Sequence, residues 1–209
     1  MRSGSDERAP RHRRHSIRLQ GYDYSEVGGY FVTICTQARQ RLFGKIVGGS
    51  VRLVPAGRMT SQSWQELPAK FPQIELDEFI VMPDHFHGIL IIPGLWPNTP
   101  EGQTNRSVPL GSMIQWFKTM TTNRYIRGVE ESAWPRFSKK VWQRNYYEHV
   151  IRDEEELNQC RKYIIENPLK WGSGQHESEA PEWLSTSPGD LGNSGRTHRC
   201  APTKKGRKP

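Results

Sequence analysis

The sequence predicts an α+β fold of the ferredoxin-like kind, an antiparallel sheet with helices packed on one face, followed by a C-terminal helix. Strand and helix patterns alternate in the order strand, helix, strand, strand, helix, strand, helix, and the first six fit that arrangement. The strand segments are rich in β-branched and aromatic residues, whereas the helical segments repeat apolar residues every three or four positions. These patterns define one domain between two polar tails.

The first part of the domain holds a strand, a hairpin and a helix. Residues 29–36, GYFVTICT, form a β-branched and aromatic run that predicts a strand. Residues 43–54 place Gly48 and Gly49 between two short apolar runs, which predicts a short β-hairpin. Residues 55–69 carry an apolar stripe at roughly helical spacing, so we expect a helix there.

The middle of the domain predicts two strands and a second helix. Residues 74–82 and 85–92 are apolar runs of strand length, separated by a break at Pro83. Residues 110–127 repeat apolar and aromatic side chains near helical spacing. The segment between them, 93–107, is rich in Pro, Gly and Asn and is expected to be a loop.

The domain ends with an extended segment and a well-marked helix. We expect residues 141–151 to be extended and residues 153–167 to be helical. Asp153 is suited to cap the helix, and Glu156 stands at the third position of a capping box. Pro168 is expected to end the helix, because proline cannot donate a backbone hydrogen bond.

Composition assigns both ends of the chain to tails. Of the 209 residues 34% are hydrophobic, and the mean hydropathy is -0.78, which is low for a globular protein. We expect a flexible basic arm at 1–19, one folded domain at 20–171 and a disordered tail at 172–209. The net charge of +8 makes polyanions plausible partners.

Cysteine usage and hydropathy indicate a cytoplasmic protein. Cys35, Cys160 and Cys200 are widely spaced and form no CxxC pair, which fits a reducing compartment better than a disulfide framework or a cysteine zinc site. No apolar stretch is long enough to span a membrane. The arginine-rich N-terminus is not followed by the apolar segment of a secretory signal.

Two histidines interrupt the apolar run IVMPDHFHGILII at 80–92. Alternate residues of a strand share a face, so His85 and His87 would point the same way and Phe86 would point into the core. Two imidazoles about 7 Å apart on one face are able to converge on one metal ion or one phosphate. A pair of histidines hydrogen-bonded at a sheet surface is the simpler alternative.

The capped helix offers partners for the histidine pair. Tyr163 and Asn167 are four residues apart and therefore share a helix face. Leu157, Cys160 and Ile164 form the adjoining buried stripe, so the Tyr163 ring is expected to pack at its border while the hydroxyl reaches out. A tyrosine at the core edge and a plain helix terminator are the structural alternatives for these two residues.

These residue types suit a reaction at phosphorus. A divalent cation held by two imidazoles and an amide oxygen keeps positions open for a phosphate. A tyrosine hydroxyl is able to attack that phosphate as a nucleophile, with help from the metal because a phenol is mostly neutral at pH 7. The product would be a 5′-phosphotyrosine link and a free 3′-hydroxyl. A nucleotide hydrolase with a histidine nucleophile would need a third histidine where Ile89 stands.

Basic side chains interleaved with aromatic ones surround Tyr163 in the sequence. Basic groups follow a phosphate backbone while rings stack on unpaired bases, so the cluster favours single-stranded nucleic acid. A solvated basic face with core aromatics is the alternative for any single residue. The candidate DNA-binding residues are Arg136, Lys139, Lys140, Trp142, Arg144, Arg152, Arg161 and Lys162.

Three blocks of the chain resemble a known family. MPDHFHGILI resembles the HUH motif (His, apolar residue, His) of single-tyrosine transposases. HSIRLQGYDYSEVGGYFVTICTQ and VWQRNYYEHVIRDEEELNQCRKYIIENPLKW are similar to the start and the end of one branch, the REP-associated tyrosine transposases. This branch is related to insertion-sequence transposases and linked to repetitive extragenic palindromes. The blocks span residues 15–171 in the right order, which makes the resemblance specific.

The resemblance implies a fold, a substrate and a site. It implies a ferredoxin-like fold, recognition of single-stranded DNA near imperfect hairpins, cleavage that depends on Mg²⁺ or Mn²⁺, and a place of action at the nucleoid. Carried over by position, His85 and His87 would be metal ligands and Tyr163 the nucleophile. Asn167 would be the third ligand, at a position where insertion-sequence relatives tend to have Gln.

Some alternatives stay open at this level. Tyr146 and Tyr147 are rival tyrosines, but they fall in the extended segment and have no amide partner four residues on along a helix. A hairpin-binding module of the same fold that has lost cleavage is the alternative function. The sequence gives neither the DNA target nor the oligomeric state, monomer or homodimer.

Overall fold

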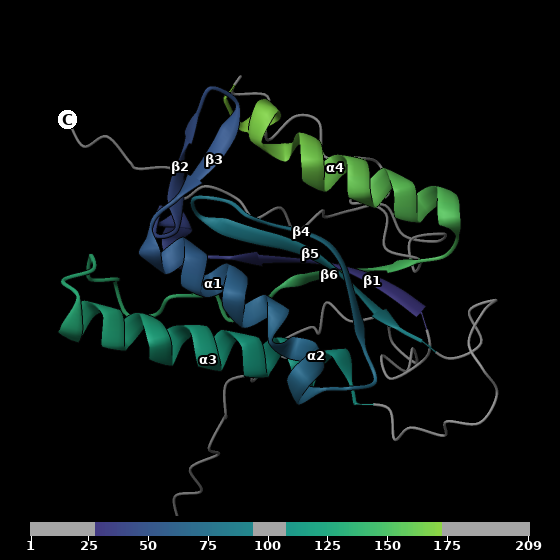
Figure 1. Cartoon of the computed structure of the whole chain (residues 1–209), viewed down its shortest axis with the longest axis horizontal. Helices are drawn as coiled ribbons and strands as arrows, with labels where there is room; N and C mark the ends of the chain where they lie inside the picture. The colour runs from purple at the N-terminus through teal and green to yellow at the C-terminus, as the bar shows by residue number, and fades with distance from the viewer. Residues whose placement is uncertain (1–27, 94–107, 173–209) are drawn as a thin grey trace, which may run out of the picture.

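The computed structural model describes residues 28–93 and 108–172 (Figure 1). The predicted arm at 1–19, the loop at 94–107 and the tail from 173 lie outside the described residues. In chain order the elements are β1 (Gly28–Cys35), η1 (Gln37–Arg39), β2 (Gly44–Val47), β3 (Ser50–Leu53), α1 (Pro55–Gln65), α2 (Leu67–Lys70), β4 (Glu75–Val81), β5 (His85–Ile92), α3 (Leu110–Glu131), β6 (Tyr147–Ile151) and α4 (Glu154–Gly172).

The main sheet has the strand order β4-β5-β1-β6, and each neighbouring pair is antiparallel. The hairpin β2-β3 forms a separate two-stranded sheet. The four strands of the main sheet therefore have the order of a ferredoxin-like sheet. Figure 1 shows α1 and α3 on one face of the main sheet and α4 on the other. The predicted α+β fold is therefore confirmed, and the C-terminal helix covers the face that α1 and α3 leave open.

The larger core lies between the sheet and the helices α1 and α3. Trp64 of α1, Phe86 of β5 and Phe117 of α3 are fully buried there. The Trp64 ring centroid is 4.5 Å from that of Phe86 and 5.2 Å from that of Phe117, distances at which aromatic pairs stabilise a core beyond their buried area. None of the described helices is long and apolar enough to cross a membrane.

A smaller core lies between the sheet and α4. It consists of Phe31, Ile89 and Ile151 from the sheet and the predicted stripe Leu157, Cys160 and Ile164 from the helix. Arg161 adds an ion pair to β4, because its Nε and Nη2 donate to the two carboxylate oxygens of Asp77 at 2.9 and 2.6 Å. At the start of α4 the backbone N–H of Glu156 donates to Asp153 Oδ1 at 2.8 Å, which is the predicted cap. These contacts set the position of α4 on the sheet.

One predicted helix is interrupted at a proline, and one predicted strand starts later than expected because of a tryptophan. The helix expected at 55–69 is split into α1 and α2. Pro68 lacks the N–H that would donate to the Trp64 carbonyl, so the helix cannot continue regularly. The strand expected from 141 starts only at β6, because the Trp142 side chain turns into the larger core and its backbone makes a single isolated bridge to Thr36, just after β1.

Two helices run further than predicted. α3 continues to Glu131 instead of ending at 127, and α4 continues through Pro168, so the prediction that this proline ends the helix is wrong. Pro168 removes one donor, the N–H that would reach the Ile164 carbonyl. The turn beyond it is held by Trp171, whose ring stacks on His85 with the centroids 5.2 Å apart.

Candidate active site

The histidine pair lies on the face of β5 that is turned toward α4. His85 and His87 stand opposite Cys35 and Thr33 in the antiparallel register of β5 and β1. Their ring centroids are 4.6 Å apart, and both side chains are buried. Phe86, between them, packs in the larger core on the other side of the sheet. The two imidazoles therefore share one face, as the strand alternation predicts.

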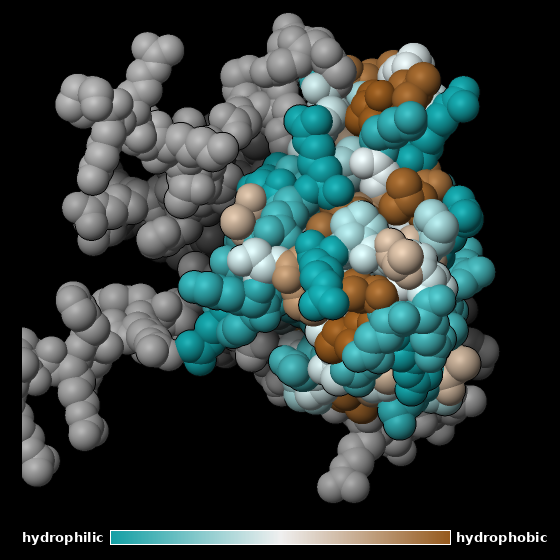
Figure 2. Space-filling view, turned by 90° about the vertical axis from the view of Figure 1, so that its left-hand side faces the viewer, coloured by the Kyte–Doolittle hydropathy of each residue, from teal (hydrophilic) through white to brown (hydrophobic). Residues whose placement is uncertain are grey.

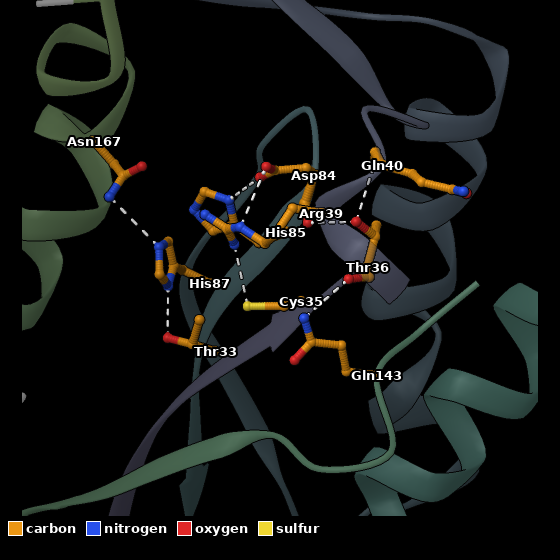
Figure 3. A network of polar contacts seen from close by, with 10 residues as sticks. All are labelled: Thr33, Cys35, Thr36, Arg39, Gln40, Asp84, His85, His87, Gln143 and Asn167. Carbon is orange, nitrogen blue, oxygen red and sulfur yellow. Dashed lines mark hydrogen bonds and ion pairs between the residues drawn. The ribbon is translucent and has the colours of Figure 1, made fainter. Parts of the chain in front are cut away.

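Each imidazole is held through its Nδ1 atom (Figure 3). His85 Nδ1 is 2.7 Å from Asp84 Oδ1, and His87 Nδ1 is 2.8 Å from Thr33 Oγ1. A carboxylate accepts a hydrogen bond from Nδ1–H and thereby favours the tautomer in which Nε2 carries the lone pair. Nε2 is then the nitrogen through which His85 would bind a cation.

Helix α4 brings a tyrosine and an amide to the same histidine. The Tyr163 ring centroid is 5.4 Å from that of His87 and 6.0 Å from that of Phe31. Asn167, about one turn later, places its Nδ2 atom 3.5 Å from His87 Nε2 (Figure 3). Tyr163, Asn167 and the histidine pair thus meet within a single chain.

The amide of Asn167 is compatible with a metal ligand. Its side chain is buried, and its Oδ1 atom has no hydrogen-bond partner among the described residues. A half-turn of the amide would aim this oxygen at the region of His87 Nε2. No three His, Cys, Asp or Glu side chains among the described residues form a metal site on their own. Two imidazoles completed by this amide oxygen fit a divalent cation.

The environment of Tyr163 keeps its phenol protonated. Burial raises the pKa of the Tyr163 hydroxyl, while a hydrogen bond with Asn167 and the positive charge of Arg39 act in the opposite direction. The net pKa lies above the ordinary value, so the hydroxyl is neutral near pH 7. Any reaction at this oxygen therefore has to remove its proton.

The rival tyrosines lie on opposite faces of the sheet. Tyr146 packs against the larger core, with Lys118 Nζ 5.9 Å from its ring centroid. Tyr147 packs against the smaller core and pairs with Thr33, the residue that also pairs with His87. Burial raises the pKa of Tyr147 strongly. Tyr146 is therefore away from the histidine pair, whereas Tyr147 is on the same face and needs an experimental control.

Most of the predicted DNA-binding residues are exposed, but two are not suited to that role. Trp142 is buried, and its indole N–H donates to Thr121 Oγ1 at 2.8 Å, so stacking of a base on this ring does not fit the structure. Arg161 is engaged by Asp77. Figure 2 views the side with the C-terminal end of α3 and the β2-β3 hairpin, where hydrophilic residues surround separate apolar patches. The exposed candidates are Arg136, Lys139, Lys140, Arg144, Arg152 and Lys162.

The sequence-based prediction missed residues that complete the site. Asp84 directly precedes the histidine pair, and this position was the available signal for its contact with His85. Arg39 lies in the turn after β1, and its Nε atom is 3.3 Å from Asp84 Oδ2. Trp171 lies beyond the predicted helix end, and no local pattern indicates that its ring reaches His85.

Sequence comparisons give related proteins. No protein-family model matches the chain. An uncharacterized protein of Haemophilus influenzae is 38% identical over 177 residues, which cover 78% of this chain and 93% of that protein. The chain therefore belongs to the same family as this protein. A second Haemophilus influenzae protein, named "Putative REP-associated tyrosine transposase", is 25% identical over 153 residues, 72% of this chain and 75% of its own length.

A solved structure carries the same family name. It is described as a REP-associated tyrosine transposase bound to a REP hairpin, and it covers 75% of both chains at 22% identity with a TM-score of 0.49. The resemblance to REP-associated tyrosine transposases that the motifs predict is confirmed by the relative of that name.

Proposed function

We propose that the chain is a DNA-processing enzyme, a metal-dependent endonuclease or strand transferase that cleaves single-stranded DNA near hairpin-forming repeats. The observation that carries the proposal is the meeting of Tyr163 and Asn167 with His87, on the face that also holds His85. The relatedness to a protein named as a REP-associated tyrosine transposase supports a transposase role acting on DNA. The activity would be exerted in the cytoplasm, at the nucleoid.

His85, His87 and Asn167 would hold Mg²⁺ or Mn²⁺ through two imidazole nitrogens and one amide oxygen. When bound, such a cation polarises a phosphate and stabilises the charge that develops on it. Asp84 and Thr33 fix the two rings through Nδ1, which orients the imidazoles without any contribution from the ion.

Tyr163 is the proposed nucleophile. Its Oη atom would form a bond to phosphorus and lose its proton, while the bond from phosphorus to the 3′ oxygen breaks and that oxygen takes up a proton. The result is a 5′-phosphotyrosine link and a free 3′-hydroxyl. Because one phosphodiester replaces another, the 3′-hydroxyl of a second strand is able to reverse the step. The position of Tyr163 on a packed helix supports this role, since a nucleophile has to be held in line.

Exposed basic side chains would follow the backbone of the DNA strand. Each contact to a phosphate releases counterions, so binding should weaken steeply as salt increases. The partner we propose is single-stranded DNA that contains hairpins of the repetitive palindrome kind, bound by a monomer or a homodimer. The proposed contacts are Arg136, Lys139, Lys140, Arg144, Arg152 and Lys162.

The test is a covalent-adduct assay. The full chain is incubated with labelled hairpin single strands, taken from repeats that flank its own gene, in the presence of Mg²⁺ or Mn²⁺. We expect a slower protein–DNA band on a denaturing gel that needs metal and is lost in Tyr163→Phe and in His87→Ala. Tyr147→Phe is the matched control and should keep the band. A band that survives Tyr163→Phe contradicts the proposal.

The burial of Tyr163 favours one alternative, a hairpin-binding module that no longer cuts. In that case the wild type would bind hairpin single strands tightly, yet form no adduct with Mn²⁺ at any pH between 7 and about 9. Binding without an adduct would therefore mean that the protein is a hairpin-binding module and not an enzyme.

A further inference from the structure

Arg39 lies in an unusual turn that returns the chain toward the histidine pair. It ends the short helix η1, which directly follows β1. Ala38 and Arg39 both have a φ of 54°, a left-handed conformation that residues other than glycine rarely adopt. The turn is fixed to the break before β5, since the backbone N–H of Thr36 donates to the Asp84 carbonyl at 2.9 Å. Such fixed and rarely populated conformations concentrate at functional sites.

The Arg39 side chain is held by Asp84 and Cys35 (Figure 3). Its Nε lies 3.3 Å from Asp84 Oδ2, and its Nη1 donates to Cys35 Sγ at 3.2 Å. The guanidinium carbon lies 5.8 Å from the ring centroid of Trp171, which in turn stacks on His85. The positive charge is within electrostatic reach of Tyr163. A cation is therefore held next to Asp84 and Trp171, the two residues that contact His85.

Neutralisation of Asp84 alone does not explain this arrangement. Arg161 and Arg124 also pair with carboxylates, and each uses two nitrogens on two oxygens at 2.6 to 2.9 Å. The contact of Arg39 with its carboxylate is longer, at 3.3 Å. Its Nη2 atom donates no hydrogen bond to the described residues, and 22% of its side chain is exposed. One edge of the guanidinium is thus available to a ligand.

We propose that Arg39 binds the phosphate group that Tyr163 attacks. A planar guanidinium with an open edge suits a phosphate, and partial burial strengthens the contact. Stacking on Trp171 and the contact with Asp84 hold the side chain in place, so little conformational freedom is lost on binding. This inference rests on the proposed function and names the residue that would bind the substrate at its reacting group.

The test measures equilibrium binding of hairpin single strands in which one phosphate at a time is replaced by an uncharged methylphosphonate. The proteins carry Tyr163→Phe so that no strand is cut. The variant is Arg39→Gln, and the matched control is Arg41→Gln, which removes the same charge from an exposed position two residues away. The adduct of the wild type identifies the phosphate that Tyr163 joins.

Arg39→Gln should weaken binding of the unmodified strand about tenfold, as expected for a lost hydrogen bond to a charged group. Arg41→Gln should change it less than about threefold. When methylphosphonate replaces the phosphate joined by Tyr163, the proteins with and without Arg39→Gln should bind the strand with equal affinity. If Arg39→Gln weakens binding equally for every modified strand, the role of Arg39 is purely structural and the inference is overturned. It is also overturned if the effect of Arg39→Gln disappears with methylphosphonate at a different phosphate. The wild type is also tested for adduct formation. If it forms no adduct, yet one methylphosphonate still removes the effect of Arg39→Gln on affinity, the proposed cleavage is wrong and the binding of a phosphate by Arg39 is retained.

Discussion

Neighbouring isoleucines of α4 test whether the smaller core holds the proposed nucleophile. Ile164 is 1% exposed and packs between α4 and the sheet, whereas Ile165 is 62% exposed. Replacing either by alanine removes three carbons, and burial of each carbon contributes about 0.8 kcal/mol. With the cavity that remains, Ile164→Ala should lower the free energy of unfolding by about 3 kcal/mol. Ile165→Ala should change it by less than about 0.5 kcal/mol.

The assay is urea unfolding followed by circular dichroism at equal protein concentration. Both variants should keep the dependence of the unfolding free energy on urea, so that the midpoints report stability directly. Equal losses in the two variants, or a loss below about 1 kcal/mol for Ile164→Ala, would refute the packing of α4 described above. Because Ile164 adjoins Tyr163, a refutation would also remove the basis for placing this tyrosine against His87.

Three further predictions concern the ion pair, a close contact and the metal. The ion pair with α4 lowers the pKa of Asp77, so its stabilisation is present above the ordinary carboxyl pKa and is lost as pH falls through the lowered value. Asp77→Asn should therefore cost about 1 kcal/mol at pH 6, measured by urea unfolding, and this cost should shrink below about pH 4. Gly57→Ala should destabilise the protein by about 2 kcal/mol in thermal unfolding, because the new Cβ would collide with the Phe43 carbonyl oxygen. Helices usually prefer alanine to glycine, so a stabilised variant would contradict the close contact. Mn²⁺ at about one hundred times its dissociation constant should stabilise the wild type by about 2.7 kcal/mol in thermal unfolding, and it should hardly stabilise His87→Ala. An equal effect on both proteins would argue against ligation of the metal by this histidine.

Local patterns were sufficient for the elements that carry the site. The apolar run around the histidine pair predicts β5 with its observed bounds, because alternation and a break at Pro83 both act within a few residues. The spacing of four between Tyr163 and Asn167 places them on one helix face, and the structure has both at His87. These features depend on periodicity, which the sequence displays directly.

Features that depend on distant contacts could not be predicted in this way. Pro168 is a local signal for a helix end, and the stacking of Trp171 on His85 lies beyond it. Trp142 stands among basic residues, but the larger core buries it. The turn of Arg39 returns to the site only because its backbone is fixed to the segment before β5. Such contacts join positions that are far apart along the chain, where no spacing rule applies.

The identity of the residue that joins DNA tests the central claim most directly. The adduct formed with Mn²⁺ is digested with trypsin and nuclease, and the peptide that keeps a nucleotide is identified by mass spectrometry. Tyr163 lies in the tryptic peptide 163–170, whereas both rival tyrosines lie in 145–152. We predict a nucleotide on Tyr163 through its 5′-phosphate. A nucleotide on the peptide 145–152 would contradict the assignment of the nucleophile to α4.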